Sequence, residues 1–279
     1  MINSLQIDKF HKDGFLHIEN FYHLDRINEI KKSIHRIINI IIDHYQLDVE
    51  KTSFSSDNFD SSYMQLLDLD RRYGSIIYDA VKQIPAFNRL VNCETNQRLF
   101  YALRSKSLPS VASGGHGIRI NNPDEEKYLA HWHQEYPAQL RSVNGLVFWS
   151  PLYDLKLENG PVIVAKESHK SGVFPVYFDG ESENAYTLKI HDLSKVLKQY
   201  DRIQPLIKAG DVLIMDFCTL HKSGNNFSNR ALWSMQFRWF DMLEETGINN
   251  DWQGSFAADT KFQDLHPELL IENTNFKSE

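Results

Sequence analysis

The chain has 279 residues, a net charge of −7 and a composition that is 42% hydrophobic and 24% charged. These values exclude a disordered, collagen-like or low-complexity chain, and the acidic balance without a Lys/Arg run argues against nucleic acid as the main partner. The two cysteines, Cys93 and Cys218, lie far apart and in no ligand-like spacing, which excludes a disulfide scaffold and fits a reducing compartment.

The N-terminal segment, Met1 to Phe10, is polar and charged and lacks the apolar core of a signal peptide. The most apolar stretch, residues 34–42, is interrupted by His35, Arg36 and Asn39 and is far shorter than the ~20 residues that span a bilayer. We therefore expect no membrane partner and a cytoplasmic location.

Helices are predicted in the first part of the chain. Isoleucines and a leucine recur at three- and four-residue steps between Leu24 and Ile41, with charged residues between them, which is typical of an amphipathic helix. The Ser-, Asp- and Asn-rich residues 52–62 read as a loop, and a second helical region is predicted over about 71–90.

Short apolar, aromatic and β-branched runs separated by turn residues follow from residue 99 onward. The predicted strands are 99–103, 117–120, 143–149, 162–164, 185–190, 212–215 and 232–240. In the last of these, Trp233, Met235, Phe237 and Trp239 alternate with more polar residues, as in a half-buried strand. The pattern predicts an α+β chain in which N-terminal helices pack on an antiparallel β core, a sandwich or small barrel.

The segment His131-Trp132-His133-Gln134-Glu135-Tyr136 carries the first candidate metal ligands. Residues two apart on a strand point to the same face, so His133 and Glu135 can grip one ion if a second histidine comes from a neighbouring strand. Two histidines and one carboxylate form the facial triad of non-haem Fe(II) oxygenases. His131 with His133 is the competing pair, but three neutral imidazoles would compensate the charge of the dication less well.

A second segment supplies the missing histidine. Residues 209–216 read as a turn and a buried strand, directly followed by His221, and Arg230 opens the last strand nine residues later. An arginine offers a bidentate fork for a carboxylate of a cosubstrate, and the hydroxyl of Ser223 could assist it. Arg238, eight residues beyond Arg230 and of the same parity, could face the same pocket or solvent.

In this order the motifs resemble the phytanoyl-CoA dioxygenase family of Fe(II)- and 2-oxoglutarate-dependent oxygenases. The resemblance covers about residues 7–240. The matching motifs are Asp13 to Phe21, His133-Gln134-Glu135, Asn159-Gly160-Pro161 with Ser168-His169, Gly210-Asp211, and His221-Lys222-Ser223 with Arg230. Glu135 stands where the family usually has Asp, and a retained carboxylate argues against halogenation.

The resemblance implies a double-stranded β-helix, or jelly-roll, core in a single domain over residues 1–279. Residues 1–95 would be mainly helical support, 96–245 the jelly-roll core and 246–279 a C-terminal extension. It implies His133, Glu135 and His221 as iron ligands. It also implies Arg230 as the clamp on the far carboxylate of 2-oxoglutarate, helped by Ser223 and Asn121.

The implied activity is a dioxygenase that uses Fe(II), 2-oxoglutarate and O2 to hydroxylate an unactivated C–H bond of a small-molecule substrate, releasing succinate. Two other hypotheses stay open. One is a non-catalytic small-molecule binding protein on the same fold, and the other is a zinc hydrolase, which would leave Arg230 and Ser223 without a role. The sequence leaves the substrate and the oligomeric state open; loops such as 52–62 and 173–184 would line its pocket.

Overall fold

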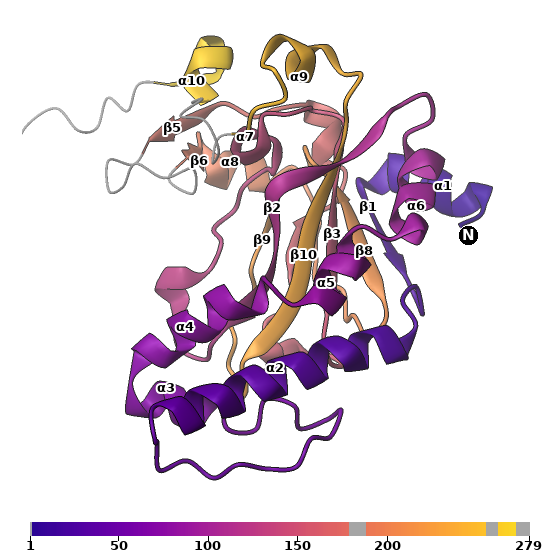
Figure 1. The fold of residues 1–279 in the computed structure, drawn as a ribbon. Coiled ribbons are helices and arrows are strands. Elements are labelled where there is room, and N and C mark those ends of the chain that lie inside the picture. The colour runs from indigo at the N-terminus through magenta and orange to yellow at the C-terminus, as the bar shows by residue number, and fades with distance from the viewer. Residues whose placement is uncertain (1, 179–187, 255–261, 272–279) are drawn as a thin grey trace, which may run out of the picture.

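Two antiparallel sheets form the centre of the computed structural model, which describes residues 2–178, 188–254 and 262–271 (Figure 1). The larger sheet has the strand order β1-β8-β3-β10-β2, and the smaller has the order β7-β4-β9. The larger sheet consists of β1 (Phe15–Ile18), β8 (Val212–Asp216), β3 (Gly145–Pro151), β10 (Leu232–Asp241) and β2 (Pro109–Asn121). The smaller consists of β7 (Arg202–Ile203), β4 (Ile163–Ala165) and β9 (His221–Lys222), and β5 (Val176–Phe178) pairs with β6 (Leu188–Ile190).

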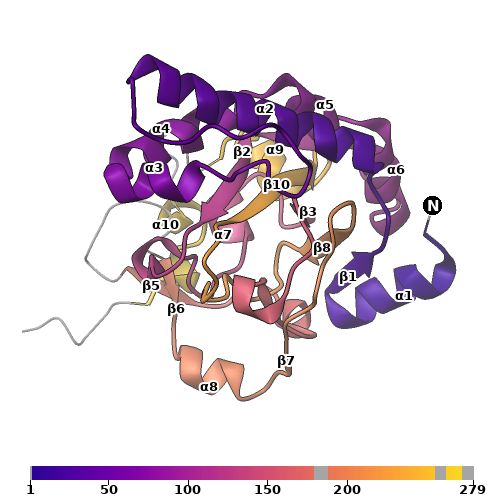
Figure 2. The ribbon, with the colours of Figure 1, turned by 90° about the horizontal axis from the view of Figure 1, so that it is seen from below.

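Helices cover one face of the larger sheet, as Figure 2 shows for α2 and α5. The N-terminal helices are α1 (Ser4–Asp13), α2 (Leu24–His44), α3 (Tyr63–Leu69), α4 (Arg71–Val81), α5 (Pro85–Val91) and α6 (Glu94–Leu103). Shorter helices follow: α7 (Tyr136–Gln139), α8 (Leu193–Leu197), α9 (Glu245–Asn249) and α10 (Phe262–Leu265), with single 3₁₀ turns at η1 (Glu126–Tyr128), η2 (Leu157–Asn159), η3 (Ser168–Ser171) and η5 (Pro267–Leu269).

Strand β10 connects the helical layer to the interior between the sheets. Its odd-numbered side chains are buried on the helical side, where the Trp233 ring lies 4.9 Å from that of Tyr63. Its even-numbered residues Leu232, Gln236 and Arg238 line a cavity together with His221 of the smaller sheet. The alternation predicted for residues 232–240 is confirmed, and it separates the core face from a polar interior face.

Three sequence predictions need correction. Residues 99–103 are the end of helix α6 and not a strand, because the buried positions Asn96, Leu99, Phe100 and Leu103 follow the helical repeat. The helix expected over 71–90 is two helices, α4 and α5, since Pro85 disfavours helical geometry at Ile84. Residues 131–136 form no continuous strand: His133 makes one isolated β-bridge, and α7 begins at Tyr136.

Two further predictions fall partly on residues that the structure does not describe. Of the strand expected over 185–190, the described part is β6, and residues 185–187 lie outside the description. Of the pocket loop expected over 173–184, residues 176–178 form strand β5 and residues 179–184 lie outside it. Among the described residues, no helix combines the length and the apolar character needed to cross a bilayer.

Candidate metal centre

Three side chains from two distant segments meet between the sheets. Donor atoms of His133, Glu135 and His221 all lie within 4.8 Å of one another. The Glu135 Oε2 atom is 4.0 Å from His133 Nε2 and 3.9 Å from His221 Nε2. The three residues that the sequence singled out as metal ligands are therefore brought together.

Backbone pairing places the two histidines side by side. The amides and carbonyls of His133 and His221 exchange two hydrogen bonds of 3.0 Å, and the imidazole centroids are 4.3 Å apart. The Glu135 amide donates to the Phe217 carbonyl at 2.9 Å, and the backbone of Glu135 already has the helical geometry that leads into α7. The side chain of Gln134 points the other way and donates to the carbonyls of Gly172 and Cys218, at 2.7 and 2.6 Å. The alternation expected of a strand thus holds locally, although the segment is only a bridge.

In each of the two histidines, a hydrogen bond between Nδ1 and a backbone carbonyl orients the imidazole ring. His133 Nδ1 lies 2.7 Å from the His131 carbonyl, and His221 Nδ1 lies 2.9 Å from the Thr219 carbonyl. A carbonyl only accepts hydrogen bonds, so Nδ1 carries the proton in both rings and the Nε2 lone pair faces Glu135. This is the tautomer in which an imidazole can bind a metal through Nε2.

Arg238 holds the carboxylate of Glu135. Its Nε donates to Oε1 at 2.9 Å and its Nη2 to Oε2 at 3.2 Å, while Gln139 Nε2 donates to Oε1 at 3.3 Å. All three donors fix the rotamer of a glutamate that is one methylene longer than the aspartate usual in the family. They also leave Oε2 as the oxygen that faces both histidines.

Burial and neighbouring charge set the protonation states. Burial opposes ionisation of Glu135, but Arg238, His133 and His221 together outweigh it and lower the pKa to about 2. Burial lowers the pKa of His221 to about 3 and also lowers the pKa of His133. At neutral pH the cluster is therefore two neutral imidazoles and one carboxylate, a donor set that fits a divalent first-row metal. Within the described residues, no other group of His, Cys, Asp and Glu meets this distance criterion.

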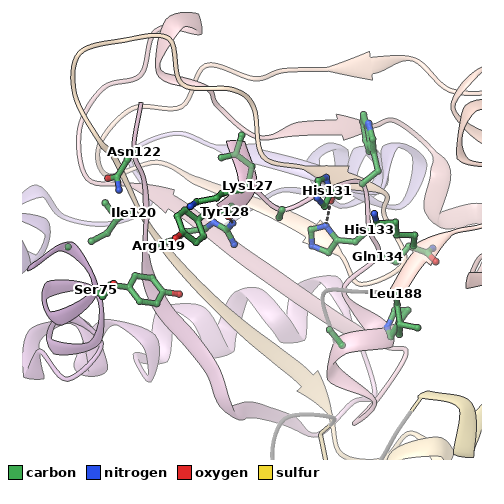
Figure 3. A pocket seen from close by; sticks show the side chains of 18 of the residues that line it. Ser75, Arg119, Ile120, Asn122, Lys127, Tyr128, His131, His133, Gln134 and Leu188 are labelled. Atoms are coloured by element: carbon green, nitrogen blue, oxygen red, sulfur yellow. Dashed lines mark hydrogen bonds between the residues drawn. The ribbon is translucent and has the colours of Figure 1, made fainter. Parts of the chain in front are cut away.

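The structure gives His131 a different place from the triad. Its carbonyl accepts the hydrogen bond from His133, while its exposed side chain lines a larger neighbouring cavity of about 650 Å³. Figure 3 shows this cavity with His131 and His133 on its wall. Of the two ligand pairs left open by the sequence, the geometry favours His133 with Glu135.

Arg230 lies outside the cavity of the triad. It donates to the carboxylate of Asp60 from Nε, at 3.1 Å to each oxygen, and from Nη2 at 2.6 Å. Its guanidinium stacks on the ring of Tyr153 at 4.2 Å, and it lines a separate cavity of about 590 Å³. Trp233 Nε1 also donates to Asp60, at 2.8 Å.

The other two residues expected at the cosubstrate site do line the small cavity beside the triad. Ser223 Oγ accepts from the Ala130 amide at 3.3 Å, and Asn121 Oδ1 accepts from Arg119 Nε at 2.9 Å. Arg119 and Arg238 line the same cavity. The two guanidinium groups beside the triad therefore belong to Arg119 and Arg238.

The contact of Arg238 with Glu135 is the feature of the site that sequence reasoning missed. The parity of position 238 indicated a side chain on the interior face, but it could not identify the partner. Gln139, which also holds Glu135, gave no signal, because its position follows from the turn into α7.

Solved structures of iron- and 2-oxoglutarate-related enzymes share this fold. The epimerase SnoN, in complex with Fe3+, alpha ketoglutarate and nogalamycin RO, matches at 15% identity over 88% of this chain and 87% of its own, with a TM-score of 0.56. The carbocyclase SnoK from nogalamycin biosynthesis matches at 14% over 94% and 95%, with a TM-score of 0.56. EctD from S. alaskensis, with 2-oxoglutarate and 5-hydroxyectoine, matches at 16% over 86% and 76%, with a TM-score of 0.55.

These likenesses establish the fold alone, a jelly-roll core with supporting helices. No curated protein matches the sequence. The family description of phytanoyl-CoA dioxygenase (PhyH), however, matches residues 10–231, which is most of the chain. The chain therefore belongs to the phytanoyl-CoA dioxygenase (PhyH) family.

Proposed function

We propose that this protein is an Fe(II)- and 2-oxoglutarate-dependent dioxygenase that hydroxylates a C–H bond of a small molecule. The observation that carries the proposal is the convergence of His133 Nε2, His221 Nε2 and Glu135 Oε2 in the tautomeric and ionisation states that a metal requires. A triad of this kind fills one face of an octahedral ion and leaves the other face for the cosubstrate and O2.

Iron with 2-oxoglutarate and O2 would supply the oxidation, in which one oxygen atom enters the substrate and the other enters succinate as CO2 is lost. The protein's own contribution is positional. His133 and His221 would bind through Nε2 with their rings fixed by carbonyl hydrogen bonds, and Glu135 would bind through Oε2 while Arg238 keeps it ionised. The side chains of Glu135 and His221 are buried between the sheets, whereas His133 is partly exposed toward the larger cavity.

The far carboxylate of 2-oxoglutarate has two candidate anchors in this proposal. Arg230 is the residue that the family motif indicates, and it can serve only if it exchanges the carboxylate of Asp60 for that of the cosubstrate. Arg238 lines the triad cavity together with Ser223 and Asn121, but its Nε and Nη2 already bind Glu135, so it would have to share its guanidinium between Glu135 and the cosubstrate. Both guanidinium groups can form the bidentate pair that a carboxylate favours.

Anaerobic titration of the Fe(II)-loaded protein with 2-oxoglutarate tests the proposal. The expected result is a weak visible charge-transfer band in the wild type that is absent from His221→Ala. Arg230→Ala and Arg238→Ala are titrated beside it, each with Fe(II) saturating because Arg238 also holds Glu135, and the anchor is the residue whose loss then raises the half-saturating cosubstrate concentration. A folded wild type that binds Fe(II) but gives no band at any 2-oxoglutarate concentration would reject the proposal.

A non-catalytic binding protein is the second candidate, and one observation favours it. Arg238 and Gln139 satisfy the Glu135 carboxylate within the protein, so the fold does not need a metal to neutralise that buried charge. Isothermal titration of the metal-free protein with Fe(II) under argon separates the two functions. Absent Fe(II) affinity in a folded protein would favour the binding protein, and micromolar or tighter affinity would favour the enzyme.

A further inference from the structure

The cavity of about 650 Å³ next to the triad has a volume suited to a small organic molecule. Its walls are helix α4, the segment from Arg119 to Ala138, and residues of β5 and β6. Arg119 and His133 line both this cavity and the small one beside the triad, which is also lined by His221, so the two spaces adjoin. A ligand in the larger cavity therefore lies next to the candidate metal.

Charge is distributed unevenly around this cavity. Its lining contains four basic side chains, Arg71, Arg119, Lys127 and Lys189, and one carboxylate, Asp79. Lys82 binds Asp79 at 2.9 Å, and the whole chain carries a net charge of −7. A positive cavity on an acidic protein focuses the field on an incoming anion. Of the four cations, Arg71 is balanced by Glu125, which accepts from its Nε at 2.6 Å and its Nη2 at 3.1 Å.

Aromatic rings line the same space. Tyr78 and Tyr128 are 40% and 50% exposed, and Trp132 is half-buried. The Tyr128 ring has the Arg71 guanidinium 4.8 Å and the Lys127 ammonium 4.9 Å from its centroid. Lys82 Nζ likewise lies 3.9 Å from the Tyr78 centroid, so it is the exposed remainder of each ring that offers apolar surface to a ligand in this concave site.

Arg119 is already fixed in the position where it would meet a ligand. Its Nε donates to Asn121 Oδ1 at 2.9 Å, and its Nη2 donates to the Tyr128 carbonyl at 2.5 Å. Figure 3 shows Arg119, Lys127 and Tyr128 gathered on one side of the cavity, away from His131 and His133. An acidic group held by Arg119 and Lys127 would leave the body of the ligand to run along Tyr128 toward His133.

We infer that the substrate is an anionic small molecule with a flat, largely apolar body, whose carboxylate or phosphate is bound by Arg119 and Lys127. The body packs against Tyr128 and Tyr78. The inference that this ligand is the substrate rests on the proposed oxygenase function, whereas its binding to the cavity does not.

Matched aromatic probes test the inference on metal-free protein. The probes are 2-naphthoate, 2-naphthyl phosphate and the neutral 2-naphthamide, with binding measured by saturation-transfer NMR and isothermal titration calorimetry. We expect at least one anion to bind about tenfold more tightly than the amide, because a hydrogen bond to a charged partner exceeds a neutral one. The stronger of the two anions identifies carboxylate or phosphate as the recognised group. Equal affinity for all three probes would overturn the inference.

Charge-removing variants locate the binding. Lys127→Met and Arg119→Met should each lower the affinity for the anionic probe about tenfold and leave the affinity for the amide unchanged. Thermal unfolding confirms that both variants fold. Lys156→Met is the matched control, since Lys156 is 79% exposed and lies outside the lining. Wild-type anion affinity in both cavity variants would reject this site.

Addition of Mn(II) separates this inference from the proposed function. If both hold, Mn(II) broadens the naphthyl resonances of the bound anion in the wild type and not in His221→Ala. If anion binding depends on Lys127 but no such broadening occurs, the cavity stands as the anion-binding site and the triad is rejected as the metal site. Broadening by Mn(II) with no preference for the anion would retain the metal centre and overturn the inferred substrate class.

Discussion

Replacing Asp60 with asparagine separates the structural role of the Arg230–Asp60 pair from any role of Arg230 in cosubstrate binding. Asp60 is 5% exposed at its side chain, whereas that of Arg230 is 30% exposed. The carboxylate accepts three contacts from Arg230, the shortest of 2.6 Å, and one of 2.8 Å from the Trp233 indole. The side-chain amide introduced by Asp60→Asn would keep the volume but remove the charge, and it would turn one acceptor into a donor.

The expected loss of stability follows from these contacts. Removing one partner of a buried ion pair costs about 3–5 kcal/mol, because it leaves the other charge uncompensated. Arg230 is partly exposed and can regain some hydration, so we expect the unfolding free energy to fall by about 2–3 kcal/mol. With a urea m-value of about 3 kcal/mol/M, the unfolding midpoint should move down by nearly 1 M.

Two further variants make this measurement decisive. Asp57→Asn changes an exposed aspartate of the same loop and should shift the unfolding free energy by less than about 0.5 kcal/mol. The double variant Asp60→Asn/Arg230→Met should recover part of the loss, since it removes the unpaired charge. An Asp60→Asn midpoint within error of that of Asp57→Asn would refute the energetic reasoning.

The same variant tests the role of Arg230. If Arg230 anchors 2-oxoglutarate by releasing Asp60, Asp60→Asn removes the internal competitor, and the half-saturating 2-oxoglutarate concentration should fall. If Arg238 is the anchor, that concentration stays at the wild-type value while stability still falls. Measuring both the charge-transfer titration and urea unfolding on Asp60→Asn therefore separates the two outcomes.

Three further predictions concern other parts of the molecule. Gly14 has φ +82° and an added Cβ would lie 2.3 Å from His169 Nδ1, so Gly14→Ala should lower the unfolding free energy by about 2 kcal/mol or more in urea titration. Burial raises the pKa of Cys218 to about 12, so its thiol stays protonated between pH 7 and 9. After treatment of the folded protein with iodoacetamide, mass spectrometry should find the label on the half-buried Cys93 alone. Labelling of Cys218 in the folded protein would contradict this. Glu135→Ala removes the one anionic donor of the triad and should weaken Mn(II) binding about 100-fold or more in calorimetry, whereas unchanged affinity would exclude the triad as the metal site.

The candidate ligands could be predicted from the sequence because their geometry is local. His133 and Glu135 are two residues apart, and the strand-like alternation that the sequence predicted around Gln134 places both side chains on one side of the chain, although only His133 makes a β-bridge. His221 follows an apolar stretch that was predicted as a buried strand, which is β8, and it opens β9 five residues after β8 ends at Asp216. Both predictions used the spacing within each segment. The one long-range contact that they needed was the pairing of the segment of His133 with that of His221.

The partners of the two arginines could not be predicted, because they depend on contacts across the whole fold. Asp60 lies 170 residues before Arg230, in a Ser- and Asp-rich loop where nothing distinguishes it from Asp57. Glu135 lies 103 residues before Arg238, and the sequence gives no measure of which interior carboxylate a guanidinium will reach. Helix α6 was mistaken for a strand for a related reason: within the five residues 99–103 both periods fit the apolar positions.

The pairing of the arginines also explains how one strand can serve both stability and chemistry. Arg230 lies two residues before β10 and binds Asp60 next to Trp233 on the helical side. Arg238 lies within β10 and binds Glu135 on the interior side. Each guanidinium neutralises a carboxylate that is at most 5% exposed at its side chain, so neither acid is left as an unpaired buried charge. The interior pair faces the histidines and can therefore respond to a metal, whereas the outer pair ties the helices to the sheet. Variants of Arg230 should for this reason affect unfolding first, and variants of Arg238 should affect metal binding first.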